Sequence, residues 1–320
     1  MKMKWIIALV ATGLFLFALS RLEVGGLAYG FRQMRTGALG LVFALQVVTQ
    51  LLLALHGYMV ARKAGMAVSF WGMLYVNSQG AVVDAITPGV KIGGEIARVV
   101  RLKHEAQATG EEAAAVVALQ KIYSLGALGV ILLPVLGYAM ATLPLGVAFF
   151  VGAALWLVLL ATVVFIPRKV RAWVEKLRPP RLRWMLWVRG VVLSALGHLT
   201  RVEKRRGAEV FYWIPPLIIW SLFPLKLYIL AVGIYPGASM AHIFAITFVA
   251  YMVAMLPIFP GGLGGFEGSM AGLLVAIGFG AGSAVALTLV FRFVTFWFVV
   301  GLSLCYIGGR KLGRGKHATK

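Results

Sequence analysis

Long apolar runs separated by short polar segments dominate the pattern of this chain. A helix that crosses the hydrocarbon core of a bilayer needs roughly 20 apolar residues. By that measure the pattern predicts spanning helices over 5–20, 37–61, 113–134, 143–166, 209–232 and 283–308. The expected fold class is therefore an all-α integral membrane protein with about six transmembrane helices.

Two further apolar segments, 69–103 and 239–280, are too interrupted by glycine and proline to be simple spans. We interpret each as two half-helices that meet at a turn, which makes a re-entrant helical hairpin. Irregular backbone is tolerated at membrane depth only where protein or water surrounds it. The predicted turn residues are Pro88, Gly89, Gly93 and Gly94 in the first segment, and Pro260, Gly261, Gly262, Gly264 and Gly265 in the second.

The two broken segments repeat one pattern. In each, a Pro-Gly pair precedes a Gly-Gly pair, and a glutamate, Glu95 or Glu267, follows seven residues after the proline. The copies lie 172 residues apart, and the same offset maps the apolar stretch 37–61 onto the apolar stretch 209–233. The pattern indicates an internal duplication. Repeated Gly/Pro breaks at corresponding positions of two halves are a pointer to a transport site.

Composition narrows the function classes. Hydrophobic residues make up 61% of the chain and charged residues 13%, which excludes a soluble domain. The single Cys305 excludes an intramolecular disulfide. The chain has none of the common metalloprotease, Walker, paired-cysteine or serine-elbow motifs, so we expect neither a cofactor nor enzymatic activity. The apolar N-terminus is interpreted as an uncleaved first span, with a cleaved signal peptide as the alternative.

The net charge of +21 is concentrated in the segment 168–206 and the C-terminal tail. Because basic loops stay in the cytoplasm, we expect a multi-pass protein of a bacterial or archaeal inner membrane with both termini cytoplasmic. The loop with Arg21, Arg32 and Arg35 conflicts with this orientation, which places it outside. The basic central loop has two interpretations. It only sets the orientation in the membrane, or it also lies on anionic lipid as an interfacial helix.

In this orientation the first broken segment enters from the cytoplasm and the second from outside. The two repeats are then inverted, an arrangement that places a binding site near the bilayer midplane. The predicted parts are an N-terminal helix and loop (1–36), repeat 1 (37–135) with re-entrant segment 69–103, a linking helix and basic interfacial loop (136–208), repeat 2 (209–308) with re-entrant segment 239–280, and a basic cytoplasmic tail (309–320).

Charged side chains within these apolar segments are the candidate substrate-binding residues, because such charges are costly in a membrane and usually face a cavity. The N-terminal ends of the half-helices also attract anions such as phosphate. Two alternatives stay open: Glu95 and Glu267 only cap the half-helices or pair with Lys121 and Arg292 to stabilise the turns, and Arg98 is only a positive-inside flanking charge. The candidates are Lys121, Arg292, Lys91, Arg98, Glu95 and Glu267.

Two more ionisable residues are candidates for proton transfer or charge balance. Asp84 precedes the first turn, where it carries a proton, balances Lys91, or simply bonds to backbone amides. Lys226 lies inside a predicted span, where it balances charge or snorkels to the membrane surface. The lone histidines His56, His198 and His242 are expected to be packing residues.

Several motifs resemble the lysylphosphatidylglycerol synthase transmembrane-region family over nearly the whole chain. The best-known members of that family form the flippase half of the bacterial multiple peptide resistance factor, which moves aminoacylated phosphatidylglycerol between leaflets and serves antimicrobial peptide resistance. The motifs are Thr87-Pro88-Gly89-x-x-x-Gly93-Gly94-Glu95-x-x-Arg98, Gln120-Lys121, Pro260-Gly261-Gly262-Leu263-Gly264-Gly265-x-Glu267, and a final span with Arg292.

The sequence also departs from the family pattern. Where that family commonly reads Glu-Arg-x-x-Asp, this chain has Gln120-Lys121-x-x-Ser124, so a buried carboxylate is missing. We also expect it to lack the soluble aminoacyl-transferring domain of those family members. We therefore expect it to move a lipid that it does not itself synthesise.

The resemblance and the paired breaks together predict a lipid flippase or transporter for an anionic or aminoacylated phospholipid or a lipid-linked headgroup. Two alternatives are a membrane subunit of an enzyme that modifies lipids or lipid-linked glycans, and an ion-coupled carrier of a small anion. The expected partners are membrane phospholipids, with a separate lipid-modifying synthase and a second copy of the chain as further candidates. No nucleic acid is expected.

Overall fold

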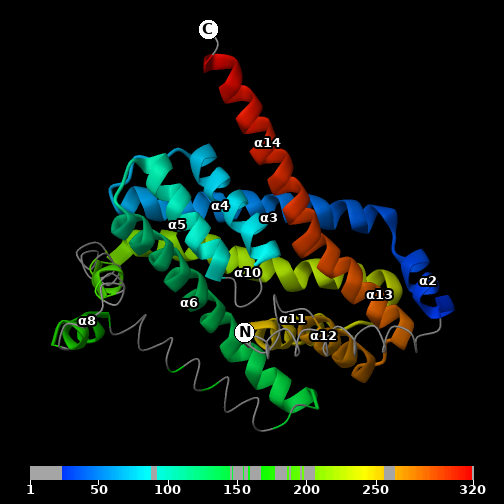
Figure 1. Cartoon of the computed structure of the whole chain (residues 1–320). Coiled ribbons are helices and arrows are strands. Elements are labelled where there is room, and N and C mark those ends of the chain that lie inside the picture. The colour runs from blue at the N-terminus through cyan, green and yellow to red at the C-terminus, as the bar shows by residue number, and fades with distance from the viewer. Residues whose placement is uncertain are drawn as a thin grey trace, which may run out of the picture.

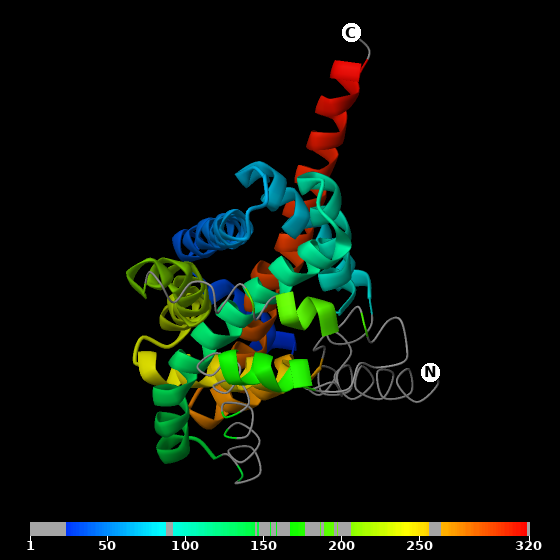
Figure 2. The same cartoon turned by 90° about the vertical axis from the view of Figure 1, so that its left-hand side faces the viewer.

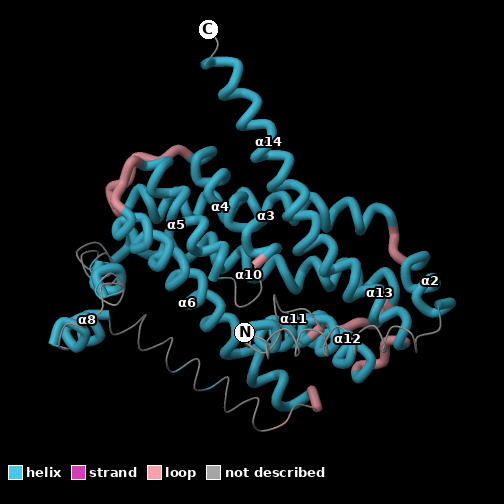
Figure 3. Tube along the Cα trace, in the orientation of Figure 1, coloured by secondary structure: helices cyan, strands magenta, loops and turns pink. Residues whose placement is uncertain are grey.

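The computed structural model describes residues 24–87, 92–144, 146, 154, 158, 167–176, 186, 189–194, 197, 206–255 and 264–318. All regular secondary structure in these residues is helical (Figure 3). The helices are α2 (Val24–Gln33), α3 (Thr36–Lys63), α4 (Phe70–Ile86), α5 (Ile92–Ala106), α6 (Gly110–Thr142), α8 (Pro167–Lys176), α10 (Arg206–Ile234), α11 (Met240–Met255), α12 (Gly265–Ala276), α13 (Ala281–Arg292), a π-helical turn (Phe293–Trp297) and α14 (Phe298–Ala318).

Four helical segments among the described residues are long and apolar enough to cross a membrane: Thr36–Lys63, Gly110–Thr142, Val210–Ile234 and Ala281–Leu312. Four of the six predicted spans fall on them. The predicted span 5–20 and most of 143–166 lie outside the described residues. Between 22% and 39% of the most apolar stretch of each helix is buried inside the protein, so much of its apolar surface faces outward, as expected for helices in lipid.

Helix α2 lies where the sequence predicted a loop. It forms because Gly30 lets the backbone approach α13 closely: a Cβ at this position would lie 2.9 Å from Ser283 Cα and from Ala286 Cβ. The segment with Arg32 and Arg35 is thus partly a packed helix, and the apolar positions around it were too short a run to be recognised as one.

Two helical hairpins lie between the long helices. Helices α4 and α5 pack against each other, as do α11 and α12. Figure 1 shows the open ends of these hairpins at opposite ends of the molecule. Adding 172 to the bounds of α4 gives 242–258, against Met240–Met255 for α11, and adding 172 to the bounds of α5 gives 264–278, against Gly265–Ala276 for α12.

Helices α3 and α10 pack side by side and run in opposite directions between the hairpins (Figure 1). The largest buried apolar cluster joins α10 to α11, α12 and α13, and includes Leu227, Ile246, Phe266 and Phe291. A second cluster joins the end of α3 to α4, α5 and α6 around Tyr123. Helix α14 packs along α4 and then extends beyond the rest of the molecule, as both views show (Figures 1 and 2).

A polar cluster fixes α14 to the first hairpin. The Glu105 carboxylate accepts hydrogen bonds from Arg101 and Arg310, both at 2.7 Å. Both guanidinium groups also lie over the Tyr75 ring, at 4.4 Å from its centroid. Burial raises the pKa of the Glu105 carboxyl, but the hydrogen bonds and positive charges of Arg310 and Arg101 outweigh burial and hold this pKa below its ordinary value.

Acidification is therefore expected to loosen this cluster. Because the pKa of Glu105 is lower in the folded state, the ionised carboxylate stabilises the fold above its unfolded-state pKa, and this stabilisation disappears as the pH falls through the lower folded-state value. In detergent, the difference in melting temperature between wild type and Glu105→Gln should shrink below about pH 4.5. Glu175→Gln is the matched control, since Glu175 forms an exposed i,i+4 pair with Arg171. A Glu105→Gln difference that stays constant on acidification would refute the assignment.

Candidate functional site

The tip of the first hairpin is held by an aspartate on α4. Asp84 Oδ1 accepts a hydrogen bond of 3.0 Å from the backbone N–H of Gly94, in the first turn of α5. Asp84 Oδ2 pairs with Arg98 Nη2 at 3.2 Å, one turn further along α5. The carboxylate thus satisfies a free amide at the start of α5 and complements the positive end of its dipole. Backbone capping, one of the roles considered from sequence, is present in this geometry.

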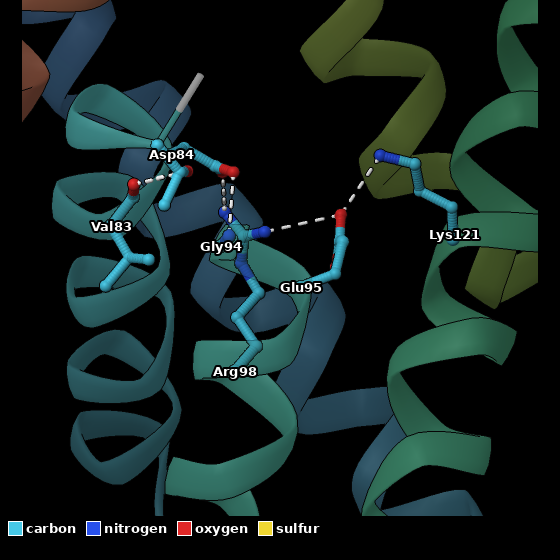
Figure 4. Close-up of polar contacts among 7 residues, drawn as sticks. Val83, Asp84, Gly94, Glu95, Arg98 and Lys121 are labelled. Atoms are coloured by element: carbon cyan, nitrogen blue, oxygen red, sulfur yellow. Dashed lines mark hydrogen bonds and ion pairs between the residues drawn. The ribbon is translucent and has the colours of Figure 1, made fainter. Parts of the chain in front are cut away.

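The ion pairs continue from the hairpin onto α6. Figure 4 shows the alternation of charge from Asp84 through Arg98 and Glu95 to Lys121. Glu95 Oε1 lies 3.3 Å from Arg98 Nη1 and 3.1 Å from Lys121 Nζ. The side chain of Asp84 is 9% exposed and that of Lys121 is 49% exposed. Lys121 is therefore the end of the series that a ligand can reach.

Two glycines make room for this arrangement. A Cβ at Gly94 would overlap the carboxyl group of Asp84, and a Cβ at Gly80 on α4 would overlap the guanidinium stem of Arg98. A real side chain at either position would push its neighbour out of the site. The glycine of the predicted turn thus serves close approach of a side chain, in addition to any role in turning the chain.

The second hairpin carries a corresponding pair. Glu267 Oε2 accepts a hydrogen bond of 2.7 Å from the backbone N–H of Gly264, which caps the start of α12. Glu267 Oε1 lies 3.1 Å from Arg292 Nε at the end of α13. The side chains are 5% and 11% exposed, respectively, so this pair is far more enclosed than Glu95–Lys121. Gly264 has φ of 81°, a conformation that favours glycine.

Aromatic rings complete the surroundings of Arg292. Its guanidinium carbon lies 5.1 Å from the centroid of Phe266 and 4.7 Å from that of Phe296, so the cation has a ring on each of two neighbouring elements. Phe296 belongs to the π-helical turn that follows Arg292 directly. Turns of this kind are frequent at functional sites because they re-aim side chains within a helix.

The two pairs correspond in sequence as well as in chemistry. Glu267 is 172 residues after Glu95, and Arg292 falls one residue short of that offset from Lys121. In each half a glutamate near the start of the second half-helix pairs with a cation on the following long helix. From sequence, Lys121 and Arg292 were expected either to bind substrate or to pair with the glutamates. The structure places a carboxylate against each of these two cations.

The remaining predicted site residues have varied outcomes. Lys226 does not snorkel, because its side chain is fully buried. Gly93 and Gly265 lie at the starts of α5 and α12. The predicted residues outside the described part of the chain are Pro88, Gly89, Lys91, Pro260, Gly261 and Gly262.

The positions that depart from the family pattern have structural partners. Ser124 accepts from the Trp220 indole N–H on α10, through its carbonyl oxygen at 2.9 Å and through its side-chain Oγ at 3.2 Å. Gln120 Nε2 approaches the Leu53 carbonyl on α3 at 3.5 Å. These neutral side chains join α6 to both central helices, where carboxylates would introduce buried charge.

Sequence reasoning missed the aromatic and polar neighbours of the charged residues. Phe266 and Phe296 gave no signal because phenylalanines are common in any apolar span. Gln46 and Thr49, which contact Lys226, did give a signal, because both are polar residues within the predicted span 37–61.

The match to known proteins extends over most of the chain. A UPF0104 membrane protein of Methanothermobacter thermautotrophicus is 24% identical over 251 residues, covering 71% of this chain and 72% of the relative. A UPF0104 membrane protein of Pyrococcus horikoshii is 22% identical over 276 residues, covering 80% and 82%. A shorter match, to a further protein of this name from M. thermautotrophicus, is 35% identical over 100 residues and covers 30% of each chain.

The family suggested by the motifs is confirmed by the extent of the match. Residues 5–303 match the lysylphosphatidylglycerol synthase TM region, from the first predicted span to the last. The region includes both hairpins and both glutamate–cation pairs. Together with the four long apolar helices, this match identifies the protein as a membrane protein of the lysylphosphatidylglycerol synthase transmembrane-region family.

Proposed function

We propose that this protein is a lipid flippase that moves an anionic or aminoacylated phospholipid headgroup between the two leaflets. The observation that supports the proposal best is the matched pair of sites, Glu95–Lys121 and Glu267–Arg292, with the glutamate of each pair on a different hairpin. The open ends of the two hairpins lie at opposite ends of the molecule. In the proposed arrangement both hairpins are re-entrant and the repeats are inverted. Such a pair of repeats presents equivalent sites to opposite sides of a membrane.

The proposed mechanism is an exchange of partners. A lipid phosphate displaces the carboxylate from a cation and takes its place, while the released glutamate keeps its other partner: Arg98 for Glu95 and the Gly264 N–H for Glu267. Lys121 makes the first contact because half of its side chain is exposed, whereas the enclosed Arg292 becomes reachable only after the repeats move. The acyl chains stay in the bilayer throughout. No bond is made or broken, so the proposed role is transport rather than catalysis.

The difference in exposure between the two pairs supports alternating access. In a symmetric pore both cations would be equally reachable. Here the first pair is open and the second is closed, as expected of a transporter resting in one of two states related by inversion. Basic segments near residues 168–176 and 310–316 favour the cytoplasmic side for the open ends of α4 and α5.

Retention of an anionic lipid by Lys121 tests the binding step. In native mass spectrometry, wild-type protein purified in mild detergent and supplied with phosphatidylglycerol should retain the lipid, and Lys121→Gln should retain it at least about tenfold less. Lys63→Gln is the control, because Lys63 is also a lysine of a long apolar helix but its ammonium group donates to Tyr123. Equal retention by wild type and Lys121→Gln would contradict the proposed entry site.

A further inference from the structure

A lysine lies at the centre of the interface between the two corresponding helices α3 and α10. The side chain of Lys226 on α10 is fully buried, and its contacts Gln46 and Thr49 on α3 are 1% and 0% exposed. Helix α3 begins the first half of the molecule and α10 begins the second, and the offset of 172 residues relates them. Any movement of one half against the other therefore changes the packing of α3 against α10.

The surroundings of Lys226 match an ammonium group. Its Nζ donates to Gln46 Oε1 and, at 3.1 Å, to Thr49 Oγ1. The Thr49 hydroxyl donates its own hydrogen to the Leu45 carbonyl at 2.7 Å, so Thr49 Oγ1 can accept a hydrogen bond from Lys226. The third direction is covered by the Phe223 ring, whose centroid lies 4.4 Å from Nζ. Three N–H groups thus have three acceptors, two oxygens and one aromatic face.

A neutral amine would fit this site less well. It has two N–H groups and a lone pair, so it could keep both hydrogen bonds, but its lone pair would then face the electron-rich ring. The cation–π attraction would be lost, and α3 and α10 would be held together by two neutral hydrogen bonds. The strength of the contact between α3 and α10 therefore depends on the protonation state of Lys226 Nζ.

No carboxylate among the described residues balances this charge. On the helices packed against α10, the titratable or charged side chains among the described residues are Tyr29 and Arg32 on α2, His56, Tyr58, Arg62 and Lys63 on α3, Glu111, Glu112, Lys121, Tyr123 and Tyr138 on α6, His242 and Tyr251 on α11, and Arg292 on α13. None of them pairs with the Lys226 ammonium group, whose contacts are Gln46, Thr49 and the Phe223 ring. A buried charge without a counter-ion is costly within a membrane and usually serves a function.

We propose that Lys226 is a proton-binding site that couples translocation to protonation: the ammonium form locks α3 to α10, and the neutral amine releases them. On release an N–H bond of Lys226 breaks, its electron pair stays on Nζ, and the proton passes to water that enters as the halves part. The ammonium group occupies the place that a free cation would take between Gln46 and Thr49. Protons rather than sodium ions then drive the cycle. This inference rests on the proposed function.

Translocation at different pH values tests the coupling. In vesicles containing the full-length protein and fluorescently labelled phosphatidylglycerol, the wild-type translocation rate should rise at least about fivefold between about pH 6 and pH 8. Lys226→Met should remain fast at both pH values, because the lock is absent. His56→Gln, the control for another titratable group on α3, should keep the wild-type profile. A wild-type pH profile in Lys226→Met, or a rate that follows a sodium gradient, would overturn the proposal.

A second readout separates this site from the proposed function. Replacing a buried charge by an apolar side chain of similar size is often neutral or stabilising, so Lys226→Met is expected to fold. In detergent, the difference in melting temperature between wild type and Lys226→Met should change with pH if Lys226 binds and releases a proton. A difference that is constant from about pH 5 to pH 9 would overturn the proton site even if lipid is translocated. A pH-dependent difference without any translocation would refute only the proposed function.

Discussion

Replacing Arg292 by glutamine is expected to destabilise the protein by about 3 to 5 kcal/mol, the usual cost of removing one partner of a buried ion pair. The variant leaves Glu267 as an uncompensated charge, with its side chain 5% exposed. It also removes the cation from between the rings of Phe266 and Phe296. Denaturant or thermal unfolding of the purified protein in detergent measures this loss.

A double variant distinguishes a structural role from a role in transport. Adding Glu267→Gln to Arg292→Gln removes the unpaired charge, while the glutamine carbonyl can still accept from the Gly264 N–H. Most of the lost stability should therefore return. Lipid translocation should not return, because the cation that would bind the phosphate is still missing. Full recovery of both properties would show that the pair only stabilises the turn.

Replacing Gly94 by alanine is expected to slow lipid translocation by at least about tenfold, a change equivalent to about 1.4 kcal/mol in the transport barrier. The added methyl group would occupy the position of the Asp84 carboxyl group. Asp84 would have to move away, which breaks its hydrogen bond to the Gly94 N–H and its ion pair with Arg98. Arg98 would then be free to draw Glu95 away from Lys121. Translocation rates in reconstituted vesicles, corrected for the amount of inserted protein, measure the effect.

Gly137→Ala is the matched control for this change. Gly137 lies within α6, and a Cβ there would meet no atom within 4 Å. Alanine favours a helix over glycine, so this variant should be as stable as wild type or more so, and should translocate lipid at the wild-type rate. If Gly94→Ala also behaves like wild type, the contact between Asp84 and the first hairpin has no part in transport.

Much of the architecture could be predicted from the sequence because lipid imposes a simple rule. A long apolar run has only a helix available to it, so 37–61, 113–134, 209–232 and 283–308 all fall on long helices. The repeated glycines and glutamates also predicted which residues would lie together. Glu95 and Glu267 pair with Lys121 and Arg292, as one of the alternatives considered from sequence required.

The details that depend on packing between distant segments could not be predicted. Lys226 was expected to snorkel or to balance charge, because nothing in the local pattern shows that Gln46 and Thr49 face it from a helix 177 or more residues away. Asp84 had several candidate partners, and only the approach of α4 to α5 selects the Gly94 amide. Helix α2 was missed because its packing on α13, rather than its own periodicity, stabilises it.

Translocation of labelled phosphatidylglycerol by purified protein in vesicles tests the central claim most directly. Labelled lipid in the inner leaflet is protected from an external quencher. A decrease in the protected fluorescence therefore measures movement of lipid across the bilayer. We predict that the wild-type protein exposes the protected lipid to the quencher at about pH 8, where the proposed Lys226 lock is open. The stable Glu267→Gln, Arg292→Gln double variant should behave like protein-free vesicles. Equal rates for wild type, the double variant and protein-free vesicles would contradict the account.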